Sequence, residues 1–339
     1  MSEKKEHIVN YDLIRVIAMF LVIAVHANPK PFESFPVLNS VFYTVTYTCN
    51  GLFFMLSGAL NLSKTFKKVD DYIHFYCSRA ISILLPFVVG SVLLTIVTYP
   101  EDIKIIPLLK SCIVDIMGGN SGGYLWFIYV LLGLLLSTPF LSKMLNNMED
   151  VELHLLAALG LCWNIVSILF CNNIGYSFGF SGWLLASWTY LFFLGYYLKR
   201  VLSEQYLKML CCVGIFSFCA NILGIYIWGE GYKYAYDLTP AHVLFTAALF
   251  GLMLRGVRIQ SDRTAKVLQV IAKHSFSVYI LHRHVKKYLS HIVAGIDNTL
   301  LEYMAHFILT AVISIVLAVI VDRIILFPIQ RMLKGKLLK

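Results

Sequence analysis

Residues 8–26 read IVNYDLIRVIAMFLVIAVH, and the chain is expected to be organised around the helix that this stretch forms. It is long and apolar enough to cross a bilayer as a helix, because about 20 residues span the hydrocarbon core. It nevertheless carries Asn10, Asp12, Arg15 and His26. A charged group in a membrane helix costs about 2.5–3.5 kcal/mol on insertion scales, so such groups face a protein interior or a wet cavity. We therefore expect this helix to turn a polar face into the protein.

Arg15 and His26 leave the predicted helix on the same side. They are eleven residues apart, which at about 100° per residue is close to three full turns and about 16 Å along the axis. One face thus carries a cation near one end and an imidazole near the other. The guanidinium needs an anion. Asp12, three residues earlier, is one candidate, and a ligand phosphate is the other.

The composition places the whole chain among polytopic helical membrane proteins. Of 339 residues, 59% are hydrophobic and 14% charged, against roughly half and a quarter in soluble domains. Only helices and closed barrels satisfy their backbone in lipid, and the apolar runs are continuous, so an all-α fold is expected. The net charge of +9 indicates basic cytoplasmic loops, not nucleic-acid binding. The eight cysteines include no CxxC pair and predict neither a disulfide framework nor a metal site.

Mostly apolar runs of about 17 to 25 residues predict about ten transmembrane helices. Their expected ranges are 8–26, 37–62, 80–99, 124–142, 151–171, 182–198, 209–228, 240–254, a ninth from residue 276, and 302–327. The less apolar stretch 100–123 predicts a short helix on or in the membrane surface. Lysines and arginines concentrate on one side if both termini are cytoplasmic, which predicts that orientation. We expect one integral-membrane domain, 1–339, embedded over about 8–327.

Some apolar runs contain small or polar side chains with a simple structural interpretation. The second run includes NGLFFMLSGAL, with Asn50 and Ser57, and indicates close helix packing. Arg79, just before the third run, is typical of a cation that snorkels to headgroups. Trp126, in the fourth, is typical of an interfacial anchor.

The last two runs carry the densest polar groups. The ninth is too polar for a lipid-facing helix, so it is expected to line a cavity or lie at the outer interface; it contains His282, Arg283, His284, Lys286 and Lys287. His282 and His284 point apart on a helix, which argues against a paired metal site. In the tenth run, Glu302 and His306 share a face; pairing with each other is favoured over a role in orienting His26. Asp322 and Arg323 are expected to be local ion partners or to snorkel.

In this order, the motifs resemble those of the acyltransferase 3 family of integral-membrane acyltransferases. Arg15 and His26 match its signature of arginine, ten residues and histidine. The other matching motifs are FFMLSG at 53–58, Arg79 with Pro86, YLWFIYVLLGLLLSTPFL at 124–141, FFLGYYL at 192–198 and HSFSVYILH at 274–282. The matches run from about 11 to 328, nearly the whole chain. The length resembles short bacterial members that lack an attached extracytoplasmic hydrolase-like domain.

The resemblance implies transfer of an acyl group, often acetyl, from cytoplasmic acyl-CoA to a hydroxyl. Usual acceptors are sugars of surface glycans or their lipid-linked precursors. His26 would be the catalytic histidine, and Arg15 would bind the donor or order the site. Arg79 would contact CoA phosphates. Many members carry a second arginine three residues on, where this chain has Ser82.

Further candidates complete this expectation. Ser57 and Trp126 are acyl-CoA-binding candidates, and the supporting candidates are Asp12, Asn50, Glu302 and His282. Acetyl-CoA would be a co-substrate, with no bound cofactor or metal. The expected partners are acyl-CoA, the glycan or lipid-linked sugar acceptor and the lipid bilayer, and the expected location is the cell (cytoplasmic) membrane.

Two other classes compete with this reading. A transporter or exporter would use Arg15, His26 and Glu302 as a proton or substrate pathway. A non-catalytic partner of a glycan-assembly complex is the third class. Hydrolysis or transfer from acyl-CoA by the purified protein separates the first class from the others, and dependence on an ion gradient favours the transporter. The ordered set of motifs favours the acyltransferase.

Overall fold

The computed structural model describes residues 8–98, 110, 113–114, 125–174, 185–228 and 238–338, with only the backbone described at 98, 168–174 and 228. Every regular element in these ranges is a helix. The short helix predicted within 100–123 lies largely outside them.

Six helices are long and apolar enough to cross a membrane, counting only the described residues. They are Val9–His26, Val69–Val97, Trp126–Asn146, Asp150–Ser167, Glu204–Ile227 and Thr299–Leu337. The prediction of an all-helical protein with several membrane spans is confirmed at this level. The number ten and the cytoplasmic orientation of both termini stay predictions.

Some predicted spans differ from the observed helices. The second run divides at Tyr47 into α2 (Pro36–Thr46) and α3 (Thr48–Asn61), each too short to span a bilayer as a straight helix. The ninth predicted span begins earlier than residue 276, because the helix α12 runs over Asp262–Val293. The basic residues between Asp262 and residue 276 therefore belong to a helix and not to a loop. The 32 residues of α12 are too polar to count among the apolar spans.

The helices form two compact units that interleave along the sequence. The first comprises residues 1–25, 30–63 and 144–273, and the second comprises 26–29, 64–143 and 274–339. The helix α1 (Val9–His26) therefore lies in the first unit except for its last residue.

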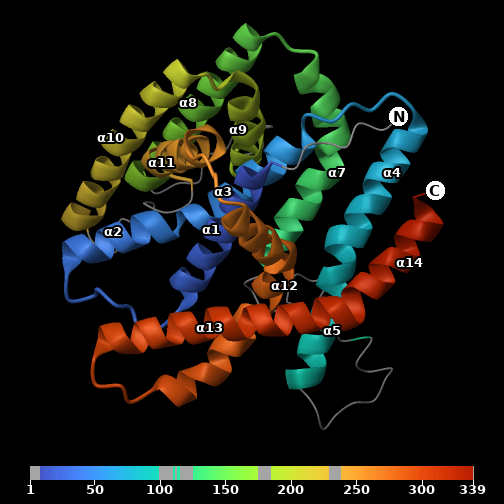
Figure 1. Cartoon of the computed structure of the whole chain (residues 1–339). Helices are drawn as coiled ribbons and strands as arrows, with labels where there is room; N and C mark the ends of the chain where they lie inside the picture. The colour runs from blue at the N-terminus through green and yellow to red at the C-terminus, as the bar shows by residue number, and fades with distance from the viewer. Residues whose placement is uncertain are drawn as a thin grey trace. The chain divides into compact units, whose positions relative to one another are not determined.

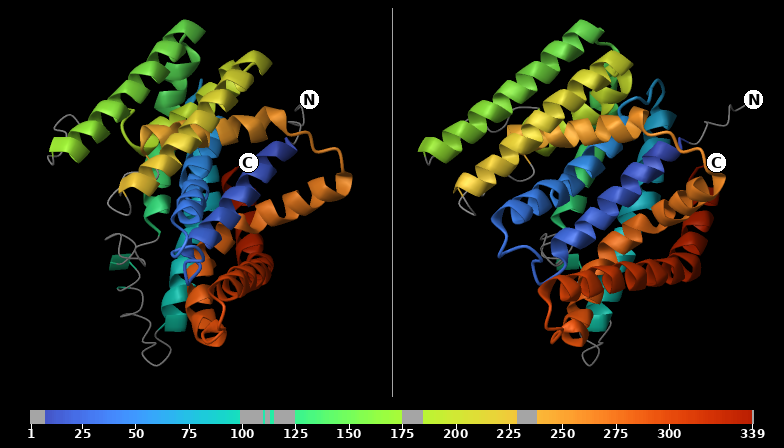
Figure 2. Two further views of the ribbon diagram at one scale, coloured as in Figure 1. Left: turned by 90° about the vertical axis from the view of Figure 1, so that its left-hand side faces the viewer. Right: turned by 60° about the vertical axis from the view of Figure 1, so that its left-hand side comes forward.

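The first unit is organised around two tight helix pairs. Besides α1, α2 and α3, its helices are α8 (Asp150–Ile174), α9 (Trp188–Val201), α10 (Glu204–Trp228) and α11 (Pro240–Gly251), which the π-helix η3 (Leu252–Gly256) extends. The helix α10 packs against α11 and α2 (Figures 1 and 2). There the buried Asn221 Nδ2 donates to Thr44 Oγ1 at 3.0 Å.

The other pair, α3 and α9, packs backbone against backbone. A Cβ atom on Gly58 would overlap the carbonyl oxygen of Phe192, and one on Gly195 would overlap that of Met55. Only glycine fits at such a crossing, which is a common way for membrane helices to approach closely. The small residues of FFMLSG and FFLGYYL therefore face each other.

The second unit contains two long helices, each with a π-helical turn. One consists of α4 (Val69–Arg79), η1 (Ala80–Leu84) and α5 (Leu85–Thr98). The other consists of α13 (Thr299–Val321), η4 (Asp322–Leu326) and α14 (Phe327–Leu337), drawn red in Figure 1. The helix α7 (Trp126–Asn146, up to Lys143 in this unit) and α12 from His274 complete it.

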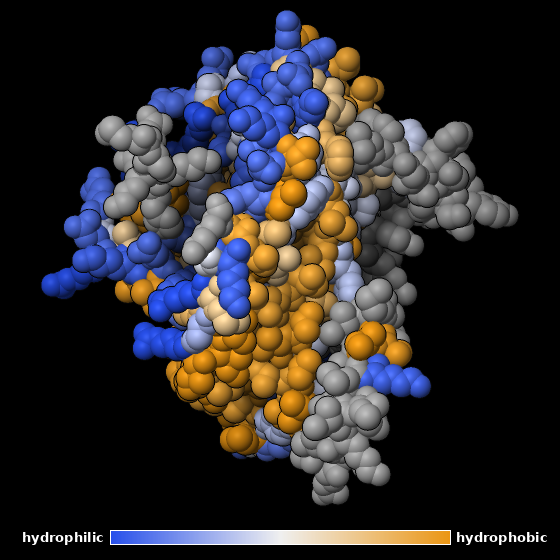
Figure 3. Space-filling model, turned by 90° about the vertical axis from the view of Figure 1, so that its right-hand side faces the viewer, coloured by the Kyte–Doolittle hydropathy of each residue, from blue (hydrophilic) through white to orange (hydrophobic). Residues whose placement is uncertain are grey.

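Side-chain contacts hold these helices together. Tyr76 on α4 donates to the carbonyl of Leu136 on α7 at 2.9 Å, and the rings of Phe87 on α5 and Tyr129 on α7 meet edge to face at 5.4 Å. The helix α13 also exposes apolar side chains, for example Ile308. Figure 3 shows a broad hydrophobic area on one face of the molecule, as expected for a surface that meets lipid.

The α3–α9 crossing predicts a large effect of a single methyl group. Gly195→Ala should lower the free energy of unfolding by about 1–3 kcal/mol or more, because a backbone oxygen cannot rotate out of the way. Gly133→Ala on α7 is the matched control, since its Cβ would meet no atom of the described residues within 4 Å. Thermal unfolding of both variants in detergent checks this. Equal midpoints would contradict the close approach.

Candidate functional site

His26 ends α1 and lies against a second histidine. The His26 and His282 rings stack with their centroids 5.3 Å apart and an interplanar angle of 24°. His282 is buried on α12, whereas His26 is half-buried. The Nδ1 atom of His282 donates to the carbonyl of Tyr279 at 2.6 Å, which fixes the ring. The structure thus brings together the predicted catalytic histidine and one of its predicted supporting residues.

A line of aromatic rings continues from this pair. The Tyr279 ring lies 5.8 Å from His282, and Phe127 lies 5.6 Å from Tyr279. Trp126 follows at 6.3 Å from Phe127, at the first turn of α7. The half-buried Trp126, predicted to bind acyl-CoA, therefore stands at the far end of a row of rings that leads to His26.

The loop that follows His26 is held by α12 and α13. His306 on α13 is buried, and its Nδ1 lies 2.6 Å from the carbonyl oxygen of Asn28. Its Nε2 lies 3.1 Å from the carbonyl oxygen of Lys286 on α12. The expected pairing with Glu302 is therefore wrong: the half-buried Glu302 lies one turn away, and the bonds of His306 go to backbone carbonyls instead.

Arg15 lies in the first unit with the acidic residue expected for it. Its Nη1 is 3.7 Å from Asp12 Oδ1, and the side chain of Asp12 is only 6% exposed whereas that of Arg15 is 33% exposed. This is an ion pair longer than a hydrogen bond. Nearby, Asn10 Nδ2 lies 2.7–3.2 Å from the carbonyls of Met253, Leu254 and Val257. The start of α1 is thus anchored at the end of η3.

The remaining predicted residues are spread over both units. Asn50 and Ser57 are half-buried on α3 in the first unit, where Ser57 precedes the crossing glycine Gly58. Arg79 is half-buried at the end of α4 in the second unit, and its guanidinium lies 5.5 Å from the centre of the Phe75 ring. Its neighbouring π-turn is fixed by Gln330, whose Nε2 donates to the carbonyl of Ile81 at 3.0 Å.

A buried polar cluster in the second unit does not follow from the sequence reasoning. His274 Nδ1 is 2.5 Å from Asp322 Oδ2, and Ser277 donates its hydroxyl hydrogen to the other carboxylate oxygen. Phe327 covers the imidazole with ring centres 5.5 Å apart. Asp322 therefore does not snorkel, and its partner is distant in the sequence, because it joins α12 to η4 through His274. The exposed neighbour Arg323 takes no part in these bonds. The sequence signal that could have revealed this cluster is the carboxylate of Asp322 within an apolar run, because such a group needs a partner inside the protein.

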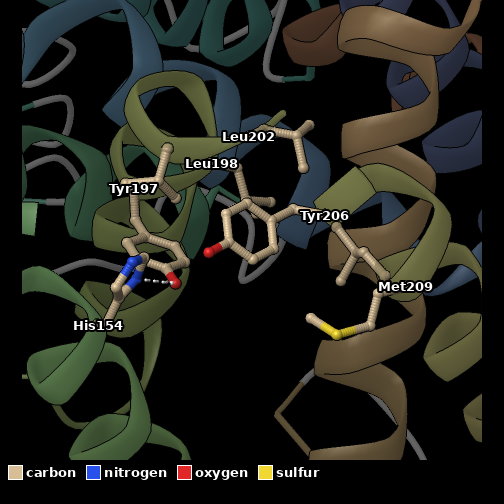
Figure 4. A pocket seen from close by; sticks show the side chains of 8 residues that line it. His154, Tyr197, Leu198, Leu202, Tyr206 and Met209 are labelled. Atoms are coloured by element: carbon tan, nitrogen blue, oxygen red, sulfur yellow. Dashed lines mark hydrogen bonds between the residues drawn. The ribbon is translucent and has the colours of Figure 1, made fainter. Parts of the chain in front are cut away.

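A cavity of about 240 Å³ in the first unit is an alternative site (Figure 4). Eight residues of α8, α9 and α10 and of the turn between α9 and α10 line it: His154, Tyr197, Leu198, Val201, Leu202, Tyr206, Met209 and Leu210. His154 Nδ1 and the Tyr197 hydroxyl bond each other at 2.8 Å. The cavity thus offers apolar volume, with its histidine engaged by a neighbour. It is smaller than the typical 300–1,000 Å³ of small-molecule sites and contains no predicted site residue.

No cluster of three or more histidine, cysteine, aspartate or glutamate side chains suited to a metal ion occurs within the described ranges. The side chains brought together at the candidate site are imidazole and aromatic groups, with guanidinium groups among the other predicted residues. A half-buried imidazole at the end of a membrane helix is suited to proton transfer.

Comparison with known proteins identifies the family of this arrangement. A family model described as an acyltransferase domain matches residues 8–323, most of the chain. No curated protein and no solved structure matches the chain.

The buried cluster around Asp322 predicts a strong dependence of stability on one carboxylate. Asp322→Ala leaves the buried His274 and Ser277 without their shared acceptor, which should lower the free energy of unfolding by about 3–5 kcal/mol. The neighbouring, exposed Arg323→Ala should change it by no more than about 0.5 kcal/mol. Parallel thermal unfolding of the two variants measures the difference. A milder effect at 322 than at 323 would refute the assignment.

Proposed function

The chain belongs to the acyltransferase 3 family, and from this premise we propose that it is a membrane O-acyltransferase with His26 as general base. It transfers an acyl group, acetyl as first candidate, from cytoplasmic acyl-CoA to a hydroxyl of a surface-glycan sugar or lipid-linked precursor. The observation that carries the proposal is the half-buried His26 stacked on the buried, carbonyl-bound His282 at 5.3 Å. The family supports acyl transfer by a multi-pass membrane protein; the donor, acceptor and cell membrane belong to the proposal.

The proposed step is a direct acyl transfer. His26 accepts the proton of the acceptor hydroxyl while the oxygen attacks the thioester carbonyl carbon. The new C–O ester bond forms and the C–S bond breaks. The CoA thiolate leaves and takes up the proton from the imidazolium. General-base catalysis of this kind contributes about 10²–10⁴ in rate.

The charged residues fit a donor with several phosphates. The ion pair of Arg15 with Asp12 is 3.7 Å long, so the N–H donors of the guanidinium can still engage an anion in the bidentate way. Arg79 is proposed as a second phosphate contact. Arg15 lies about 16 Å from His26 along α1. An extended pantetheine arm has a similar length, so a donor whose phosphates contact Arg15 would place its thioester near His26.

The decisive experiment follows CoA release from acetyl-CoA by detergent-purified protein. Turnover is measured with and without a glycan extract of the host, using radiolabelled acetyl-CoA. Release that requires His26 and rises with the extract would support the proposal and trace the label to its acceptor. Absence of both binding and release of acetyl-CoA would reject acetyl transfer, and a longer acyl-CoA tests the remaining donor class.

We predict that His26→Ala lowers kcat by a factor of about 10²–10⁴, because the general base is lost. The control is His291→Ala, which removes an exposed histidine of α12. Both proteins are compared by initial rates of CoA release and by size-exclusion elution. Unchanged turnover by a well-folded His26→Ala protein would eliminate the imidazole as base.

We predict that Arg79→Ala raises KM for acetyl-CoA about tenfold, as expected if one charge-assisted contact worth about 1.4 kcal/mol is lost. Arg331→Ala on α14, an exposed arginine, should leave KM within twofold. Binding of desulfo- or dephospho-CoA compared with CoA shows which donor group is sensed. If the variant lowers kcat at constant KM, Arg79 has another role.

A further inference from the structure

The backbone just after His26 is bound by a single buried side chain. The Nδ1 atom of His306 lies 2.6 Å from the carbonyl oxygen and 3.2 Å from the amide nitrogen of Asn28, two residues beyond His26. His306 is 1% exposed. A buried histidine with bonds on both ring nitrogens has a fixed ring plane. It therefore restrains the backbone groups to which its ring nitrogens are bonded.

The other ring nitrogen ties the same imidazole to α12. Nε2 lies 3.1 Å from the carbonyl oxygen of Lys286 and 3.5 Å from Ser290 Oγ. Lys286 also reaches the loop directly: with the Asn28 amide oriented to suit its neighbours, Lys286 Nζ donates to the Asn28 side-chain oxygen at 2.8 Å. The loop is therefore bound to α12 both through His306 and beside it.

The segment from His26 to Asn28 thus meets α12 at two places one helical turn apart. His282 stacks on the ring of His26, and Lys286, four residues later on the same face, holds Asn28. Between these two positions Ala27 is 1% exposed. Fixing Asn28 consequently fixes the place of His26 along α12.

We propose that His306 is a positioning residue that fastens the Asn28 backbone to α12 and thereby holds His26 against His282. The functional part rests on the proposed role of His26 as general base. His306 contacts no reacting atom. Its effect is on orientation, for which a displacement of about 1 Å can cost 10²-fold in rate.

Two conservative variants separate the contacts of His306. Asparagine places its amide nitrogen where histidine has Nδ1, so His306→Asn can keep the Asn28 contact and loses the one to Lys286. Glutamine places its amide nitrogen at the Nε2 position, so His306→Gln can keep the Lys286 contact and loses the one to Asn28. Thr310→Val is the matched control, because Thr310 is buried one turn further along α13 and its hydroxyl has no hydrogen-bond partner among the described residues.

The experiment measures kinetics and backbone exchange on the same full-length proteins in detergent. The expected result is that His306→Gln lowers kcat about 10²-fold at unchanged KM for acetyl-CoA, that His306→Asn stays within about fivefold of wild type, and that Thr310→Val is unaffected. Hydrogen–deuterium exchange of peptides containing Asn28 should be faster in His306→Gln than in His306→Asn.

The two readouts distinguish the possible failures. Equal loss of kcat in the Asn and Gln variants, or a loss that follows thermal stability alone, would overturn the positioning role. Equal exchange of the Asn28 amide in all variants would overturn the fastening, whatever the kinetics. If wild type does not turn over any acyl-CoA and the exchange order holds, the proposed function fails while the fastening of the loop is supported.

Discussion

A polar side chain in a membrane helix needs a partner inside the protein, because lipid offers none. The helix α1 meets this requirement three times in succession. Asn10 donates to carbonyls at the end of η3, Asp12 forms an ion pair with Arg15, and His26 stacks on the ring of His282. The contacts of Asn10 and His26 restrain the two ends of α1 against other helices, whereas the Asp12–Arg15 pair lies within α1 itself. Asn10 and His26 leave α1 on nearly opposite sides, about 160° apart at 100° per residue, so the helix is restrained from more than one side.

The π-helical turns also take part in polar contacts inside the protein. A π-turn disturbs the regular α-helical bonds and is frequent at functional sites. In the described part of the chain, three such turns lie beside long-range polar contacts. The η1 carbonyl of Ile81 accepts from Gln330, the η3 carbonyls of Met253 and Leu254 lie beside Asn10, and η4 begins with Asp322, which binds His274. At η1 and η3, half-buried side-chain amides thus satisfy carbonyls of the irregular backbone, whereas η4 contributes a buried carboxylate.

The sequence predicts those features that depend on local composition. The span 8–26 is observed as α1 almost to the residue, because its length and apolarity are local properties. The break at Tyr47 is not predictable in this way, since no glycine or proline marks it. The early start of α12 does carry a local signal, because Ser261 Oγ accepts from the Thr264 amide as a helix N-cap does. Similarly, His26 and His282 could each be named from motifs, but their stacking depends on how α12 packs. The bond of His306 to Asn28 joins residues 278 positions apart, and pairing with the neighbouring Glu302 was the simpler expectation.

A general base at a helix end has to reconcile two demands. Its ring must be open enough for a substrate hydroxyl to reach it, and yet it must be held within a fraction of an ångström. With His26 as the proposed base, the two demands would fall on different residues. His26 is half-buried at the last position of α1, where a helix loses its own restraining bonds. The rigidity comes from residues that are themselves buried, His282 against the ring and His306 against the following backbone. A reactive group can remain accessible when its neighbours in space carry the restraint.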